Sequence, residues 1–417
     1  MKPLDHILGL KCVLCGAEYS PDEALYVCPK HGSEGILDVI YDYGIIRKRM
    51  SKESLVQDRD FSIWRYSALL PIAEREMAPP LHVGWTPLYR AIRLEKKLGL
   101  RALWLKDDGR NPTASLKDRA SAVGVVKAME LGRKKITAAS TGNAASSLAG
   151  IAASVGIKTY IFVPQTAPKA KIAQLLIFGA NVIAVRGTYD QAFDLCLKAS
   201  EEYGWYSRNT AYNPYLSEGK KTAALELCEQ LGWNVPDRVF VSVGDGCIIG
   251  GLWKGFKDLY ALDFIEKLPK LMGVQAEGSA VLARAWEKGT EEIEPIVPQT
   301  IADSIAVGIP RDRIKALRAV RESGGAFLTV SDEEILEAMR VLGREAAVFG
   351  EPAGVASFAG LAKAIREGKI GNEESVAVLV TGNGLKDVES AIKVTGAPHI
   401  IDPTMEDLRR LMIESII

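Results

Sequence analysis

The sequence predicts an α/β protein built from open, mostly parallel sheets that helices cover on both faces. Short apolar runs with strand character alternate with helical patterns along most of the chain. This alternation is typical of repeated βαβ units, whose strands are parallel and buried on both sides. The 417 residues suggest more than one domain, and an apolar content of 47% is enough for sizeable cores.

The first element in chain order is an N-terminal segment with two pairs of metal-binding residue types. Cys12 and Cys15 have the spacing of half a tetrahedral zinc site, and Cys28 with His31 supplies a second pair. The alternative is that these thiols only pack, without a metal. A connector over 61–80 follows; it contains three prolines and is expected to be partly helical.

The next elements lead to a lysine in an unusual setting. A strand is expected over 102–106 and a helix from about Lys117, so the Lys117 amine lies near the positive end of a helix dipole. That position disfavours the protonated amine, and a neutral amine is the form that attacks a carbonyl. The neighbouring Thr113 and Ser115 offer hydroxyl groups beside it.

The remaining elements place three further polar loops after buried strands. Residues 138–147 contain Ser140, Thr141 and Asn143 before an alanine-rich helix, a suitable site for a carboxylate or phosphate. Taken alone, this loop is better explained as an ordinary helix cap, and a Gly-x-Gly after a strand is weak evidence because tight turns use the same residues. The other strands and helices are expected over 160–164 (strand), 169–178 (helix), 181–185 (strand), 191–203 (helix), 239–243 (strand), 252–259 (helix) and 378–380 (strand).

The two later loops follow the strands at 239–243 and 378–380. Glycines at 244 and 246 allow backbone amides to close on a phosphate before the helix that follows. Thr381 places a hydroxyl at the carboxyl end of its strand, the edge of an open α/β sheet where ligands bind. Cys196 and Cys228 lie on helix faces and are expected to be core thiols.

In this order, the four loops resemble those of the fold-type II pyridoxal-phosphate enzymes, and within them the threonine synthase branch. The resemblance extends from about Gly84 to Asp387. It implies two open three-layer αβα domains, as in the tryptophan synthase β subunit, after a small zinc-ribbon-like N-terminal module. The domains expected from it are 1–60 for the module and connector, 61–105 with 200–417 for a large cofactor-binding domain, and 106–199 for a small α/β domain.

The resemblance also implies a role for each matching residue. Lys117 would hold pyridoxal 5′-phosphate as a Schiff base and move protons to and from the substrate, and Thr381 would face the pyridine nitrogen. Ser140 and Thr141 would hold the substrate carboxylate, and Asn143 would contact both the cofactor ring hydroxyl and the substrate. The backbone of one loop would bind the cofactor phosphate: Gly244, Asp245, Gly246, Cys247 and Ile248. The cysteine-rich start resembles that of many microbial members of the branch, with His31 in place of the usual fourth cysteine.

Three departures from the branch concern the substrate. Leu216 stands where an arginine usually follows Asn-Pro-Tyr and binds the substrate phosphate. Leucine cannot replace a bidentate arginine, so either Lys220 or Lys221 compensates or both are ordinary surface lysines. Asp245 places an acid beside the expected phosphate, so its carboxylate must point away or the loop binds another group. Residues 307–310 are more apolar than the Gly-Asn-Pro run usual in the branch.

The expected function is therefore a lyase or synthase that uses pyridoxal phosphate, with threonine synthase as the leading hypothesis. Its reaction would convert O-phospho-L-homoserine and water into L-threonine and phosphate. The alternatives are a same-fold enzyme on another amino acid, namely O-phosphoserine-type β-replacement, an ammonia-lyase, or the β subunit of 2-amino-4-oxopentanoate thiolase. A zinc-ribbon nucleic-acid-binding protein and a catalytically silent homologue are further alternatives.

Charge and composition define the expected partners and location. The 52 basic and 52 acidic residues balance, so no broad surface for nucleic acid or a membrane is expected. The first residues lack the apolar core of a signal peptide, and no apolar run approaches the ~20 residues of a membrane span. A cytoplasmic protein without disulfides is therefore expected. The resemblance implies in addition that the protein is a homodimer and acts on a small amino-acid substrate.

Overall fold

A six-stranded sheet forms the centre of the computed structural model, which describes residues 4–73, 75–167 and 169–414. The strand order is β12-β11-β10-β13-β5-β4, and only the β4–β5 pair is antiparallel. The predicted mostly parallel α/β class is confirmed. The strands are β4 (Leu88–Arg90), β5 (Ala102–Asp107), β10 (Arg238–Ser242), β11 (Lys270–Ala276), β12 (Ala326–Val330) and β13 (Ser375–Val380).

Helices cover both faces of this sheet. As a result, alternate residues of a strand pack into two different cores, one on each face. In β10, Val239 and Val241 pack in one core and Phe240 packs in the other. This is the two-sided burial expected of a parallel strand. The first core includes residues of α8 (Tyr215–Gln230), α9 (Cys247–Ala261), α10 (Val281–Glu287) and α11 (Arg313–Glu322); the second includes residues of α3 (Ile92–Leu98), α12 (Asp332–Ala346) and α13 (Pro352–Arg366).

A second, fully parallel sheet has the order β8-β7-β6-β9. Ile161 and Val163 of β7 pack in a core with α5 and α6, whereas Phe162 packs with α7 on the other face. Cys196 lies in the α7 core, as predicted. The elements are β6 (Lys135–Ala139), β7 (Lys158–Pro164), β8 (Asn181–Val185), β9 (Tyr206–Ser207), α4 (Lys117–Glu130), α5 (Asn143–Ala153), α6 (Lys169–Ile177) and α7 (Tyr189–Glu202).

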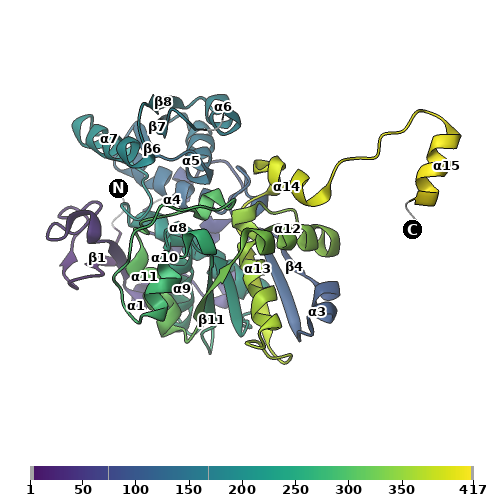
Figure 1. Cartoon of the computed structure of the whole chain (residues 1–417). Coiled ribbons are helices and arrows are strands. Elements are labelled where there is room, and N and C mark those ends of the chain that lie inside the picture. The colour runs from purple at the N-terminus through teal and green to yellow at the C-terminus, as the bar shows by residue number, and fades with distance from the viewer. Residues whose placement is uncertain (1–3, 74, 168, 415–417) are drawn as a thin grey trace.

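The N-terminal residues form a small antiparallel sheet of order β2-β1-β3 that lies against the larger body (Figure 1). Its strands are β1 (Ile7–Cys12), β2 (Glu18–Tyr19) and β3 (Leu37–Tyr41), and α1 (Tyr43–Arg49) and α2 (Lys52–Gln57) follow. The connector contains short 3₁₀ segments at Ile63–Leu69 and Arg75–Met77, in agreement with its predicted partial helicity. The domain boundaries given above stay a prediction.

Helix α9 begins five residues earlier than the predicted helix over 252–259. The sequence Gly250-Gly251 has low helix propensity, which favoured a later start. These glycines allow α8 and α9 to pack closely: a Cβ on Gly251 would lie 3.1 Å from the Lys220 Cβ, and one on Gly255 would lie 2.6 Å from the Lys221 carbonyl oxygen. Helix packing therefore overrides local propensity and places Cys247 at the helix start.

The C-terminal segment after β13 contains α14 (Val388–Thr395) and α15 (Met405–Glu414). Helix α15 extends away from the rest of the molecule, and Met405, Met412 and Ile413 on it are exposed (Figure 1). Within the described ranges, no helix combines the length and apolar character that a membrane crossing requires.

Candidate active site and metal cluster

Lys117 is the first residue of α4 and lies in the wall of a cavity of about 860 Å³. The loop before it is fixed to the end of β13, because the Leu116 amide donates to the Thr381 carbonyl at 2.9 Å and Ser115 forms a bridge with Gly382. Burial, with the nearby cations Lys220 and Arg208, lowers the pKa of the Lys117 amine to about 8. The amine therefore exchanges protons close to neutral pH.

The cavity brings together most of the residues predicted to form the site. Its volume lies in the range usual for a small-molecule site. Thr381 does not line it; this residue lies behind the Lys117 loop, buried, with its carbonyl bound to Leu116. The predicted residues in the cavity wall are Lys117, Ser140, Thr141, Asn143, Gly244, Asp245, Gly246, Cys247 and Ile248.

The glycine loop joins β10 to α9 and directs the start of that helix at the cavity. Gly246 has φ +94°, and a Cβ there would lie 2.7 Å from the Ala316 Cβ, so only glycine fits. The first amides of α9 have no partner within the helix and can bind an anion. The Asp245 carboxylate accepts a hydrogen bond from the Arg311 backbone amide at 3.3 Å. This carboxylate therefore points toward the backbone at Arg311.

Asn143 begins α5 and contacts a residue to which the sequence assigned no role, Glu351. The Asn143 side-chain amide donates to Glu351 Oε1 at 2.5 Å, and burial raises the pKa of Glu351. Gly382 is required beside this pair, because any Cβ there would collide with the Glu351 carboxylate. Glu351 begins the run Glu351-Pro352-Ala353-Gly354, a minor match to the threonine synthase branch and the only signal for this residue in the sequence.

The departures from the branch have clear structural consequences. Leu216 is buried and faces α4, since a Cβ on Gly124 would lie 2.9 Å from the Leu216 Cδ2. Lys220 and Lys221 are both buried, so the alternative that they are surface lysines is wrong. Lys221 forms ion pairs of 2.6 Å with Glu218 and 2.7 Å with Asp258, within the α8–α9 contact. Residues 307–309 line the cavity.

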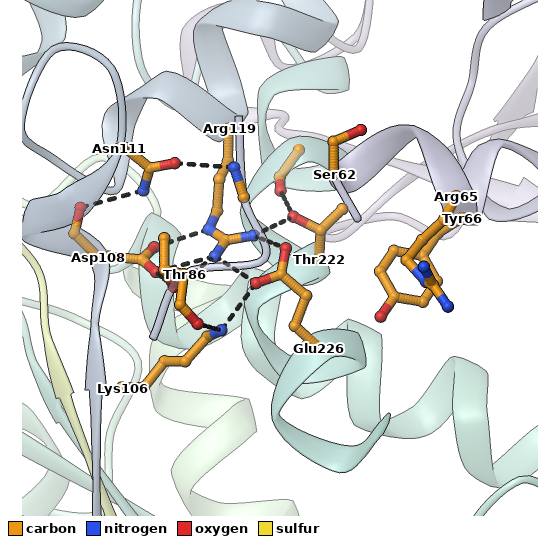
Figure 2. A network of polar contacts seen from close by, with 12 residues as sticks. Ser62, Arg65, Tyr66, Thr86, Lys106, Asp108, Asn111, Arg119, Thr222 and Glu226 are labelled. Carbon is orange, nitrogen blue, oxygen red and sulfur yellow. Dashed lines mark hydrogen bonds and ion pairs between the residues drawn. The ribbon is translucent and has the colours of Figure 1, made fainter. Parts of the chain in front are cut away.

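A buried ion network holds the start of α4 against β5 and α8. Figure 2 shows the Arg119 guanidinium between the carboxylates of Asp108 and Glu226. Arg119 donates to Asp108 at 2.7 and 2.8 Å and to Glu226 Oε2 at 2.7 Å, and Lys106 donates to the same Glu226 oxygen at 2.8 Å. The two cations thus balance the two carboxylates. Because Arg119 follows Lys117 by two residues in α4, this network fixes the position of the lysine.

Cys12, Cys15, Cys28 and His31 form a cluster in the N-terminal module. Their ligand atoms all lie within 4.8 Å of one another, a geometry that could hold a metal ion. The Tyr19 hydroxyl lies 3.2 Å from the Cys28 sulfur, a contact that would support a bound thiolate. The cluster is close to the active-site loop, because Val13 packs in a small apolar cluster with Cys247.

The fold and this site define an enzyme that uses pyridoxal phosphate. The family described as pyridoxal-phosphate dependent enzyme matches residues 80–382, and the chain belongs to it. The resemblance predicted from the four loops is therefore confirmed at the level of the family.

Individual relatives agree with this assignment. The chain is 41% identical to a threonine synthase of Methanocaldococcus jannaschii over 97% of its own length and 99% of that protein. It is 42% identical to a threonine synthase of Methanosarcina acetivorans, with 96% and 97% covered. Among solved structures, threonine deaminase isoform 2 of Solanum lycopersicum is similar with a TM-score of 0.64 and 25% identity, over 74% of this chain and 82% of that one.

Proposed function

We propose that this protein is a threonine synthase that converts O-phospho-L-homoserine and water into L-threonine and phosphate. The observation that carries the proposal is the near-full-length similarity to the threonine synthases of Methanocaldococcus jannaschii and Methanosarcina acetivorans, at 41% and 42% identity. The cavity supports it, because Lys117 and the start of α9, whose free backbone amides can bind an anion, both lie in the cavity wall.

The residues of the cavity suit pyridoxal phosphate. The glycine loop leaves the first amides of α9 available to the cofactor phosphate, and Gly246 has no room for a side chain. The Lys117 amine, with a pKa of about 8, is available to bind the cofactor aldehyde. When bound, the cofactor would supply an electron sink for a carbanion at the substrate.

The protein residues would bind the substrate and move its protons. Ser140 and Thr141 precede α5 and would hold the substrate carboxylate at that helix start. Asn143 would orient the cofactor ring, with its amide held in place by Glu351. The Lys117 amine would take and return protons at the substrate carbons. Thr381 lies outside the cavity wall and would act on the cofactor only through the Lys117 loop, because its carbonyl accepts a hydrogen bond from the Leu116 amide.

The test is the reaction itself. Purified protein with pyridoxal phosphate should release phosphate from O-phospho-L-homoserine and form threonine in equal amounts. The matched control, Lys117→Ala, should lose both this activity and the borohydride-sensitive visible absorbance. A yellow wild-type protein that releases no phosphate would overturn the proposal.

A second candidate is a same-fold enzyme on another amino acid, which the departure at Leu216 favours. A leucine that packs on α4 cannot bind a substrate phosphate. Formation of ammonia and a 2-oxo acid would indicate an ammonia-lyase, and sulfide-dependent loss of phosphate from O-phosphoserine would indicate β-replacement. Activity only with coenzyme A and a partner chain would indicate the thiolase subunit.

We further propose that the Cys/His cluster binds zinc and that the enzyme is a cytoplasmic homodimer. Three sulfurs and one imidazole are a ligand set that zinc favours. The exposed apolar residues of α15 support a contact with a second copy, because Met405, Leu408, Met412 and Ile413 are grouped on one short helix and such a group gains from burial. Metal analysis with well under one equivalent of zinc, or sedimentation as a monomer, would refute the corresponding part.

A further inference from the structure

Arg208 is a buried cation in the cavity wall with an unused donor. It directly follows β9, where its amide donates to the Thr137 carbonyl at 2.8 Å, and only 1% of it is exposed. Its Nε donates to the Ser121 hydroxyl at 3.1 Å and its Nη1 to the Thr210 hydroxyl at 3.2 Å. The remaining nitrogen, Nη2, has no hydrogen-bond partner among the described residues.

The charge of Arg208 is also unbalanced. In the described part of the chain no carboxylate forms an ion pair with it, whereas the equally buried Arg119 has two. Burial lowers the pKa of Arg208 to about 10, so the guanidinium remains protonated at neutral pH. A buried cation with neutral partners only is unfavourable, and an anionic ligand in the cavity would correct this.

The location of Arg208 matches the function that Leu216 cannot perform. The Asn213 side chain donates to the Ser207 carbonyl at 2.8 Å, and the Asn213 amide donates to the Asn209 carbonyl at 3.2 Å. These bonds hold the residues on both sides of Arg208 against the start of α8, the helix that carries Leu216. Burial lowers the pKa of Lys220 of α8, and the Arg208 guanidinium is close enough to that lysine to lower it further, so a cation lies near this helix although residue 216 is apolar.

We propose that Arg208 is the specificity-determining residue that binds the side-chain phosphate of the substrate. This inference rests on the proposed function and identifies the substrate class of the site as amino acids with a phosphorylated side chain. The unused Nη2 and the Thr210 hydroxyl are the groups that meet the phosphate oxygens. A dianionic phosphate with a guanidinium forms charge-assisted hydrogen bonds that the side chain of Leu216 cannot provide.

The cofactor phosphate has a separate site. That phosphate would bind at the start of α9, next to the six-stranded sheet, where backbone amides and the helix dipole are available. Arg208 approaches from the end of β9 in the four-stranded sheet. Arg208 is close enough to Cys247, the first residue of α9, for the two groups to interact electrostatically, so the two anion sites would adjoin, one next to each sheet.

The experiment measures binding of a phosphorylated and an unphosphorylated amino acid to the holoenzyme. O-phospho-L-homoserine and L-homoserine are titrated while the visible absorbance of the bound cofactor is followed. Wild-type protein should bind the phosphorylated compound much more tightly. In Arg208→Gln this preference should fall by about 100-fold or more, with an intermediate loss in Arg208→Lys, which keeps the charge without the fork.

The matched control is Arg311→Gln. Arg311 faces the same cavity, but its guanidinium pairs with Asp190 at 3.7 Å and lies over the Phe193 ring, so the preference should change by less than about fivefold. Circular dichroism and the cofactor affinity of each variant identify any folding defect, and Arg208→Lys provides the test if Arg208→Gln does not fold.

Each outcome decides the inference. An unchanged preference in the Arg208 variants, or equal binding of both amino acids by wild type, would overturn it. A loss of pyridoxal-phosphate affinity with the preference intact would assign Arg208 to the cofactor phosphate, which also overturns it. If wild type prefers the phosphorylated amino acid through Arg208 but forms no threonine, the proposed function fails and this inference stands.

Discussion

Replacement of Glu226 by glutamine tests whether the buried ion network positions the catalytic lysine. Glu226 lies fully buried between Arg119 and Lys106, with distances of 2.7 and 2.8 Å from its Oε2 to their nitrogens. Although burial opposes it, these two cations lower the pKa of Glu226 from an ordinary 4.5 to about 2. A change of that size corresponds to about 3 kcal/mol in favour of the ionised folded state.

Glu226→Gln should therefore lower the free energy of unfolding by about 3 kcal/mol at pH 7, or the thermal midpoint by about 3 °C for a chain of this length. Glutamine keeps the volume but removes the charge that two buried cations need. A carboxylate whose pKa is lower in the folded than in the unfolded state stabilises the folded protein fully at pH values above its unfolded-state pKa. This stabilisation is lost as the pH falls through the folded-state pKa. The difference between wild type and variant should therefore shrink from about pH 4.5 towards pH 2.

The assay is thermal and urea unfolding of the cofactor-free protein, followed by circular dichroism from pH 7 to pH 2. The matched control is Glu337→Gln, which breaks an exposed pair with Arg340 and should change stability by less than about 1 kcal/mol. Because α4 begins at Lys117, the variant should also bind pyridoxal phosphate less tightly. An effect no larger than that of the control, or a difference that stays constant down to pH 2, would refute the reasoning.

Three further predictions concern the site. The rate at which cofactor-free protein captures pyridoxal phosphate should rise with pH and level off above about 8, because the neutral Lys117 amine reacts; a rate still rising at pH 10 would contradict this. Glu351→Ala should weaken cofactor binding about tenfold by releasing Asn143, whereas Glu351→Gln should not, as absorbance titration would measure. Removal of metal by a chelator, or Cys15→Ser, should lower both the thermal midpoint and the cofactor affinity, because the cluster loop packs on Cys247; an unchanged affinity would disconnect the two sites.

The sequence predicted the elements that carry a strong local signal. The apolar runs of β7 and β13 mark buried parallel strands, and the expected helices at α6 and α7 lie within a few residues of their bounds. The strands β4 and β9 have only three and two residues, too few to show a period. The order of strands in a parallel sheet depends on crossovers and contacts between distant segments, which no local pattern contains.

The same distinction applies to the site. Lys117 and the loops at 140–143 and 244–248 were predicted because a strand, a small-residue loop and a helix start follow one another along the chain. Glu351 and Arg208 had no such signal. Neither residue stands in a local pattern that indicates a site. Their importance arises from burial beside partners that are distant in the sequence, Asn143 for Glu351 and Ser121 for Arg208.

With Arg208 as the proposed phosphate ligand, the departures at the substrate site would change the position of a charge rather than remove it. Lys117 is surrounded by two buried cations, Lys220 and Arg208, and both lower its pKa. An anion bound at Arg208 would neutralise part of this field and raise the pKa of the amine. A phosphorylated substrate would therefore help Lys117 to retain a proton when the substrate is in place, and an unphosphorylated one would not. Specificity and proton transfer would then depend on the same guanidinium.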